Sequence, residues 1–260
     1  MKKIFAILLV LCMALTVLVA CNNGDNADDV TTPADDVTTP ADDVTTPADE
    51  GTTFDPAAKS EGVMTYAEYD AAAMDAEVVI EAYVQATQSW WDNKITVYLQ
   101  DPDGAYFAYE LACSEEDAAK LTKGTKIKVK GYKGAWAGEI EIMSGTFEIM
   151  EGNWVAEATD VTDLLGTEEL IKHQNKFVKF TELTIESIEY KNGEPGDDIY
   201  VNLTKNGATY SFCVERYLTG PDTDVYKAFA ELKAGDVVDV EGFLYWYEGV
   251  NTHITAVTKK

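Results

Sequence analysis

One pattern occurs twice in this chain and constrains its fold more than any other feature. Residues 121–131 and 232–242 both read Leu-x-x-Gly-x-x-Ile/Val-x-Val-x-Gly, with each shared residue at the same spacing. Aliphatic residues that alternate after a glycine are typical of a β-strand leaving a turn. The repetition therefore predicts two copies of one strand-rich unit.

Short alternating segments surround the first copy of the pattern. Asp101-Pro102-Asp103-Gly104 is typical of a tight turn, and Ser114 precedes three acidic residues as a helix cap does. Three strands, a helix and two strands is the element order of the OB-fold, a small barrel of five strands. In chain order we predict strands at 78–86, 95–99 and 105–111, a helix at 114–121, and strands at 126–131 and 138–149.

The second half of the chain repeats this order, with an alternating segment at 199–203 in the place of 95–99. A lead-in helix is predicted before each first strand, beginning at Thr65, where Glu68 completes a capping box, and at Thr167. The fold class predicted is mainly β. It comprises two tandem OB-fold five-stranded barrels, residues 62–151 and 152–260, each with a lead-in helix and a helix between strands 3 and 4.

With these features the chain resembles the OB-like modules of bacterial surface lipoproteins and of secreted sugar-nonspecific nucleases. The resemblance rests on the Gly-x-x-Val/Ile-x-Val-x-Gly phrase and covers both barrels. It implies the fold. The catalytic parts of the nuclease family lie in other domains, and nothing in this sequence matches them, so the resemblance implies no nuclease activity.

The first 21 residues indicate where the protein acts. Lys2 and Lys3 precede an apolar stretch at 4–20, as in a secretory signal peptide. Leu18-Val19-Ala20-Cys21 resembles the lipobox of a bacterial lipoprotein, which implies cleavage of residues 1–20 and diacylation of Cys21. We therefore expect a protein lipid-anchored to the outer face of a bacterial cell membrane. The alternative is a transmembrane anchor, because 17 apolar residues reach the lower limit of spanning length.

Residues 21–60 have the composition of a linker. The sequence Ala-Asp-Asp-Val-Thr-Thr-Pro occurs at 27–33, 34–40 and 41–47. Proline and like charge disfavour a helix and favour an extended chain. We predict a disordered acidic tether between the lipidated Cys21 and the first barrel.

The charge of the chain limits its partners. Twenty Lys and Arg residues stand against 46 Asp and Glu residues, a net charge of −26, which excludes a general footprint for duplex DNA. Lys126, Lys128 and Lys130 form a local basic patch on the predicted fourth strand. We expect these lysines to pair with Glu139 and Glu141 on the fifth strand. The alternative is a basic surface that binds a ligand.

Aromatic side chains gather in the loops that border the predicted binding faces. An OB-fold binds ligands across strands 2 and 3, between the loop joining strands 1 and 2 and the loop joining strands 4 and 5. Rings exposed there would form a stacking platform for a base or a sugar, whereas rings that cover the barrel ends would be structural. The candidate ligand-binding residues are Trp90, Trp91, Trp136, Tyr245, Trp246 and Tyr247.

The sequence contains no recognisable set of catalytic residues. His173 and His253 are the only histidines, and neither belongs to a recognisable nucleophile motif. The sequence has no Cys-x-x-Cys pair, and we expect Cys113 and Cys213 to be two separate buried thiols. We predict that the protein is not an enzyme and has no cofactor and no metal site.

The expected location, the rings beside the clefts and the lack of a catalytic set together predict a function. The prediction is a non-catalytic, membrane-tethered extracellular binding lipoprotein whose ligand is a glycan or a protein. One alternative is a single-stranded nucleic-acid-binding OB protein, whose affinity would fall steeply with salt. The other is a structural spacer or assembly subunit of the cell surface, which would have no pocket.

Overall fold

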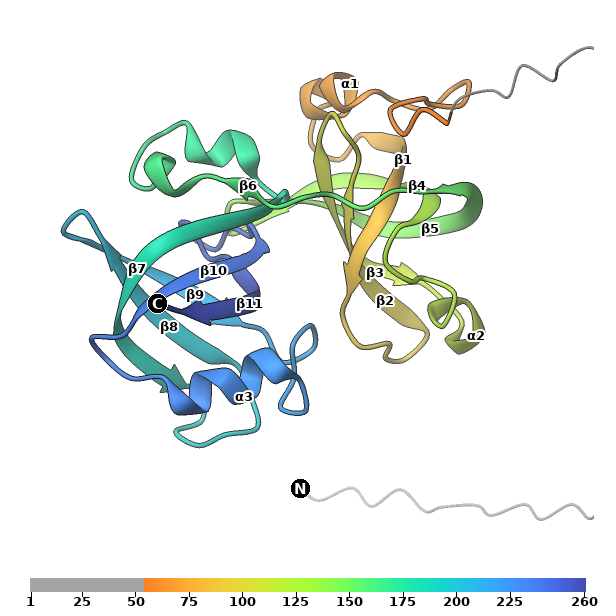
Figure 1. Ribbon diagram of the computed structural model, residues 1–260. Coiled ribbons are helices and arrows are strands. Elements are labelled where there is room, and N and C mark those ends of the chain that lie inside the picture. The colour runs from red at the N-terminus through yellow and green to blue at the C-terminus, as the bar shows by residue number, and fades with distance from the viewer. Residues whose placement is uncertain (1–53) are drawn as a thin grey trace, which may run out of the picture. The chain divides into compact units, whose positions relative to one another are not determined.

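Five strands close into a barrel in the first half of the computed structural model, which describes residues 54–260 (Figure 1). Its elements are α1 (Tyr66–Ala71), β1 (Glu77–Thr87), β2 (Lys94–Gln100), β3 (Ala105–Ala112), α2 (Glu115–Ala118), β4 (Thr125–Trp136) and β5 (Glu139–Asn153). The strands follow the ring order β1-β2-β3-β5-β4, and β3 pairs with β5 in parallel. This is the OB-fold arrangement, so the predicted fold class is confirmed. The predicted signal peptide, Cys21 and nearly all of the predicted tether lie outside the described residues.

The second half repeats the pairings with one weak link. Its elements are β6 (Thr159–Asp160), η1 (Thr162–Leu164), η2 (Leu170–His173), β7 (Phe177–Tyr190), β8 (Ile199–Lys205), β9 (Ala208–Val214), α3 (Asp224–Glu231), β10 (Val237–Phe243) and β11 (His253–Lys259). β7 pairs with β8 and β10, β8 with β9, and β10 with β11. The parallel contact between β9 and β11 consists of one residue pair, His253 and Cys213, so this second barrel is less fully closed than the first.

The glycines of the repeated pattern explain why it occurs twice. Gly124 and Gly235 have φ angles of 93° and 88°, a conformation that favours glycine. Gly131 and Gly242 lie where the chain passes close to the next strand. A Cβ atom would stand 2.7 Å from the Ile142 side chain at Gly131 and 2.2 Å from the His253 carbonyl oxygen at Gly242. The pattern therefore encodes one turn and one close approach in each barrel.

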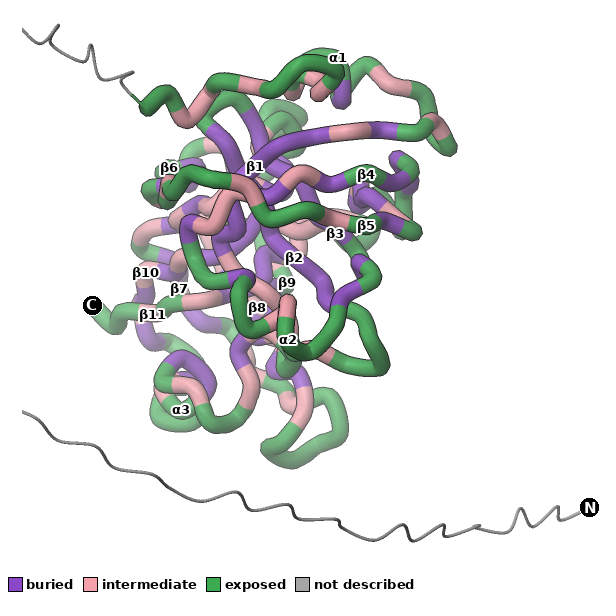
Figure 2. Tube along the Cα trace, turned by 90° about the vertical axis from the view of Figure 1, so that its right-hand side faces the viewer, coloured by how far each residue is buried: buried purple, intermediate pink, exposed green. Residues whose placement is uncertain are grey.

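The first strand is buried on both of its faces. Val78, Ile80, Ala82 and Val84 point into the barrel core as predicted, but Glu81 and Tyr83 on the opposite face are also fully buried. The buried stretch of β1 is visible in Figure 2. The segment preceding α1 supplies this cover, because Phe54 packs edge-on against Tyr83 and Lys59 donates a hydrogen bond of 2.6 Å to the Glu81 carbonyl oxygen.

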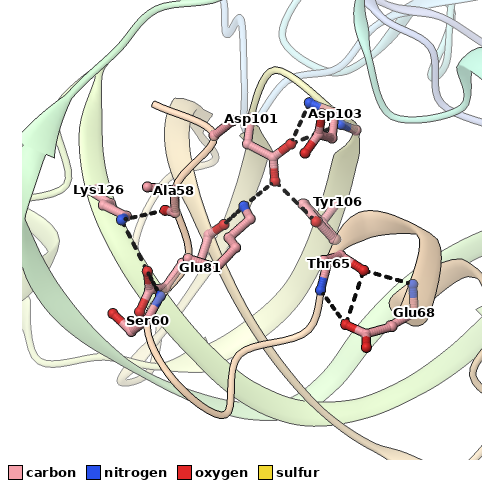
Figure 3. Close-up of polar contacts among 12 residues, drawn as sticks. Ala58, Ser60, Thr65, Glu68, Glu81, Asp101, Asp103, Tyr106 and Lys126 are labelled. Carbon is pink, nitrogen blue, oxygen red and sulfur yellow. Dashed lines mark hydrogen bonds and ion pairs between the residues drawn. The ribbon is translucent and has the colours of Figure 1, made fainter. Parts of the chain in front are cut away.

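Caps and turns follow the sequence closely in the first barrel. Thr65 and Glu68 form the predicted capping box, and the Asp101 carboxylate accepts hydrogen bonds from the backbone N–H groups of Asp103 and Gly104, each 2.8 Å long (Figure 3). Cys113 and Cys213 are buried and unbridged, as expected. The helix expected at 114–121 is confirmed in place but is shorter, since α2 spans one turn only.

Two expectations for local structure are wrong, and one element was not foreseen. No α-helix begins at Thr167, because its hydroxyl donates to the Leu164 carbonyl oxygen and a 3₁₀ turn, η2, follows instead. The short strand β6 was not expected. The segment 131–138 was expected to be a loop, but β4 continues to Trp136 and only Ala137 and Gly138 turn the chain into β5.

The two barrels share a small buried cluster. Tyr98 and Phe107 of the first barrel pack with Phe243 of the second, and the rings of Tyr98 and Phe243 stack with centroids 4.4 Å apart. The Tyr98 hydroxyl lies 2.6 Å from Nδ1 of His253. Since these groups are buried, the barrels are held together by core packing as well as by surface contacts.

Candidate functional site

A rigid hairpin presents one tryptophan beside the β2–β3 face. Trp91 and Lys94 exchange backbone hydrogen bonds of 3.0 and 2.9 Å across Asp92 and Asn93. Both central residues have positive φ, 48° and 59°, as in a type I′ turn. The indole of Trp91 stands at the base of this turn, and the residue is 78% exposed.

A β-bulge shapes the neighbouring strand. In the β2–β3 ladder Thr96 alone faces both Tyr109 and Glu110, so β3 carries one extra residue. Glu110 has a φ of 48° and its N–H donates to the Thr96 hydroxyl, 3.2 Å away. Its carboxylate holds the Lys94 ammonium at 2.7 Å. A non-glycine residue with positive φ stores backbone strain, and such strain is common at binding sites.

The second barrel supplies the opposite wall. Just after β9, the Arg216 guanidinium lies over the Tyr217 ring, 5.1 Å from its centroid. The Ser89 backbone N–H donates a hydrogen bond of 2.7 Å to the Tyr217 carbonyl oxygen. The Glu215 carboxylate accepts a 2.8 Å hydrogen bond from the Leu218 N–H and so fixes the turn.

These elements enclose an open groove of about 580 Å³. Its rings are Trp91, Tyr109 and Tyr217, and the latter two are 42% and 52% exposed. Its charged groups are Lys94, Glu110 and Arg216. The groove therefore combines three exposed aromatic residues with two cations and one carboxylate, and it requires residues from both barrels.

The sequence-based candidates separate into three groups. Trp91 lines the groove. Trp90 turns the other way, because it packs on the core of the first barrel and its indole N–H donates to the Cys113 carbonyl oxygen at 2.8 Å. Tyr245 stacks on His253 with centroids 4.2 Å apart, and Trp246 packs against the core of the second barrel. An exposed stacking face is thus not observed for Trp90, Tyr245 or Trp246.

Trp136 and Tyr247 are exposed but lie outside the groove. Their loops, each joining the fourth strand of its barrel to the fifth, contact one another. The Glu248 N–H donates to the Ala137 carbonyl oxygen at 2.7 Å, and the Trp246 N–H donates to the Glu139 carboxylate at 2.8 Å. The loop expected to border the first cleft is therefore engaged with the second barrel.

The basic patch is paired, but with other acids than expected. Lys126 and Lys128 lie 3.0 and 3.3 Å from the buried carboxylate of Glu81, and Lys130 lies 3.2 Å from Glu77 (Figure 3 for Lys126). The predicted pairing with Glu139 and Glu141 is wrong, because these acids lie on the part of β5 that borders the second barrel. The pairing partners belong to β1, the other neighbour of β4.

Burial shifts the pKa values of two carboxylates where the barrels meet. Desolvation raises the pKa of Glu139 to about 8, although hydrogen bonds from Trp246, Asn175 and Gln174 oppose the shift. Desolvation likewise raises the pKa of Glu215, beside the groove, to about 7. Both acids therefore bind a proton near neutral pH far more readily than an exposed glutamate does.

The groove residues from β3 and from the segment after β9 were not predicted. Arg216 is conspicuous in the sequence because it is the only arginine among the 20 basic residues. Nothing in the sequence places it near Trp91. Within residues 54–260 no group of three or more His, Cys, Asp and Glu side chains could hold a metal ion. Over the same residues no helix is long and apolar enough to cross a membrane.

No protein-family model matches this chain, and no curated protein matches it. It is similar to the solved HINa domain of Ifi202 in complex with 20bp dsDNA, at 10% identity, with 71% of this chain and 98% of that chain covered and a TM-score of 0.33. A murine DNA-binding protein bound with ds DNA gives 12% identity, coverages of 72% and 97%, and a TM-score of 0.35. A deletion mutant of the single-stranded DNA binding protein from Thermus aquaticus gives 14% identity, coverages of 71% and 93%, and a TM-score of 0.23. Because these TM-scores are low, the OB-fold assignment rests on the strand pairing of this chain.

Proposed function

We propose that this protein is a non-catalytic binding module that holds a short glycan in the groove between its two barrels. The observation that carries the proposal is the set of three exposed rings, from Trp91, Tyr109 and Tyr217, around one groove. A sugar ring has an apolar face that stacks on such rings and hydroxyl groups that bond to the polar side chains between them. The volume of about 580 Å³ suits a small ligand, since ligand pockets span about 300 to 1,000 Å³.

The size and charge of the groove favour a glycan over a protein. A stable protein interface typically involves about 20 to 30 residues on each side. This groove is lined by only ten residues. Polar side chains such as Gln88 and Thr96 lie between the rings. They suit a polyhydroxylated ligand better than an apolar peptide side chain.

A second candidate ligand is single-stranded nucleic acid. The groove lies on the strand 2–3 face that OB-folds use for oligonucleotides, and Arg216 and Lys94 stand beside rings on which bases could stack. Against it, Lys126, Lys128 and Lys130 of β4 are paired with Glu77 and Glu81, so this row of lysines is not free to follow a phosphate backbone. The DNA named for the solved structures belongs to those proteins and does not decide between the two candidates.

We further propose that the module is tethered to the outer face of a bacterial membrane. The support is the lipobox-like Leu18–Cys21 and the acidic, proline-containing repeat that follows it. In a bacterial host, the full chain should incorporate radiolabelled palmitate and stay with the membrane fraction. Cys21→Ser should abolish both, and label that persists in this variant would contradict the anchor.

A glycan and oligonucleotide array tests the groove. The full chain should bind a set of oligosaccharides, and Trp91→Ala should weaken binding by about 1 to 3 kcal/mol, the size of one lost stacking contact. Trp136→Ala is the matched control, because it removes another exposed tryptophan of the first barrel outside the groove.

The array outcomes separate the three functional classes. Binding to oligonucleotides alone, with affinity that falls steeply with salt, would replace the glycan with nucleic acid. Equal losses in Trp91→Ala and Trp136→Ala would reject the groove. No binding to either class would leave a structural spacer as the better account.

A further inference from the structure

The proposed function leaves the chemical class of the sugar open, and the groove's cations bear on it. We propose that the groove selects glycans that carry a carboxylate, and that Arg216 is the residue that binds this carboxylate. The inference rests on the proposed function, because it assumes that a sugar stacks on the rings beside Arg216.

Arg216 is the one groove cation without a close acidic partner. Its guanidinium lies 3.9 Å from the Asp197 carboxylate, beyond hydrogen-bond distance, and among residues 54–260 it makes no side-chain hydrogen bond. The side chain is 42% exposed in the groove wall. By contrast, Lys94 is held by Glu110 at 2.7 Å. The donors of Arg216 are therefore free to meet a ligand.

The acids around Arg216 are engaged elsewhere. Lys191 lies 2.8 Å from Asp198 and 3.7 Å from Asp197, so it offsets about one of their two negative charges. Glu215 accepts from the Leu218 N–H, and burial raises its pKa toward neutrality. Among the groove-lining residues two cations stand against one carboxylate, in a chain whose net charge is −26. The lining residues therefore carry one more positive than negative charge, with Asp197, Asp198 and Glu215 next to Arg216 outside the lining.

The guanidinium of Arg216 suits a carboxylate ligand, and one guanidinium without a close acidic partner suits a ligand with one carboxylate at this point of the groove. A guanidinium offers parallel N–H groups that match a carboxylate with two hydrogen bonds, while its flat face stays on an aromatic ring. Arg216 stacks on Tyr217 in the groove wall, so a sugar that packs on the Trp91 or Tyr109 ring could present its acid group to the guanidinium donors. One free cation does not match the several phosphates of a polynucleotide. The chemistry favours a uronic or sialic acid.

Calorimetry on the full chain tests this inference. The acidic probes are a galacturonic acid trisaccharide and sialyllactose, and their neutral counterparts are a galactose trisaccharide and lactose. We expect at least one acidic probe to bind about 10- to 100-fold more tightly than its counterpart, as a charge-assisted hydrogen-bonded pair implies.

Two variants of Arg216 and one control assign the effect. Arg216→Gln should remove the preference for acidic sugars while leaving any binding of neutral sugars. Arg216→Lys should keep only part of that preference, because an ammonium group lacks the two parallel N–H donors of a guanidinium. Lys172→Gln removes a charge from an exposed pair outside the groove and should change nothing. Thermal unfolding of each variant checks that it is folded.

The outcomes distinguish this inference from the proposed function. Equal affinity for acidic and neutral sugars, or a preference that survives in Arg216→Gln, overturns the role of Arg216 while sugar binding stands. Failure of all four sugars with tight binding of a thymidine oligonucleotide overturns both.

Discussion

The two barrels share one strand plan but differ on the face where an OB-fold binds its ligand. In the first barrel the β2–β3 ladder contains the bulge at Tyr109 and Glu110, and the type I′ turn holds Trp91 beside it. In the second barrel β8 and β9 pair over seven residues without a register shift. The groove thus lies where one copy departs from the common plan, and the other copy contributes a wall.

The barrels also carry opposite charges on equivalent strands. Lys126 and Lys128 of β4 pair with the buried Glu81, whereas Asp239 of β10 pairs with Lys260 at 2.5 Å. The signs are reversed and the partners come from different neighbours, because Glu81 lies on β1 whereas Lys260 follows β11. This comparison indicates that the basic patch of the first barrel is part of its structure.

The largest expected effect comes from removing the buried acid. Burial alone would raise the pKa of Glu81, but hydrogen bonds from Ser60 and Lys126 outweigh it and lower the pKa to about 2. Glu81→Ala leaves two largely buried lysines without their partner and should cost about 3 to 5 kcal/mol in urea unfolding. Asp239→Ala, at a 25% exposed side chain, should cost less than about 1 kcal/mol. Equal losses would remove the contrast between the barrels.

The contact between the barrels should weaken as pH rises. Glu139 starts β5 and inserts its fully buried carboxyl against the second barrel. Its pKa is about 8 in the fold against 4.5 when unfolded, so between these values the folded state binds more protons and the free energy of unfolding falls with pH. The loss should reach about 4 to 5 kcal/mol by pH 9, at roughly 1.4 kcal/mol for each unit of pKa difference.

The matched variant for this pH effect is Glu139→Gln. It keeps the shape of the side chain and removes the titration of Glu139, so the part of the pH dependence between pH 5 and pH 9 that comes from Glu139 should disappear, while the part that comes from Glu215 remains. The equivalent first residue of β11 is His253, whose pKa burial lowers to about 3, so its contribution appears only on the acid side, below about pH 6.5. A pH profile unchanged in Glu139→Gln would refute the assignment.

Alanine at the last glycine of the repeated pattern should test the close approach in each barrel. In Gly242→Ala the new Cβ meets the His253 carbonyl oxygen at 2.2 Å, whereas in Gly131→Ala it meets the Ile142 side chain at 2.7 Å and the Met143 carbonyl oxygen at 2.8 Å. Both should destabilise by about 1 to 3 kcal/mol, with Gly242→Ala the worse because its contact with backbone is shorter. The reverse order in thermal unfolding would show that the barrels pack differently at this point.

The smallest expected effect separates two adjacent tryptophans. Trp90→Phe leaves the Cys113 carbonyl oxygen without its donor and should cost about 1 to 2 kcal/mol in urea unfolding. Trp91→Phe changes an exposed ring and should stay within about 0.5 kcal/mol of the parent chain. If both lose the same stability, Trp91 is structural and the groove loses its main ring.

The sequence predicts those features that depend on local chemistry. The alternation of β1, the capping box at Thr65 and the Asp101 turn each follow from neighbouring residues, and the repeated pattern predicts the strand order. The barrel core follows because inward residues recur at every second position. These features do not depend on which surfaces meet.

The groove could not be predicted because it depends on how the barrels meet. Trp90 and Trp91 are adjacent residues of the same type, so the sequence does not show which ring is exposed. In the structure Trp90 packs on the core and Trp91 is exposed beside the turn at Asp92 and Asn93. Arg216 reaches the groove because the segment after β9 bonds to Ser89 of the first barrel. The loop carrying Trp136 was expected at the cleft, but it contacts the second barrel instead.

The most direct test is a titration of the full chain, labelled at its five indole N–H groups, with the galacturonic acid trisaccharide and observed by NMR. The account predicts that the Trp91 signal shifts with ligand while the Trp136 and Trp90 signals stay in place. Shifts at Trp136 alone, or none at Trp91 when the sugar binds, would contradict the groove as the binding site.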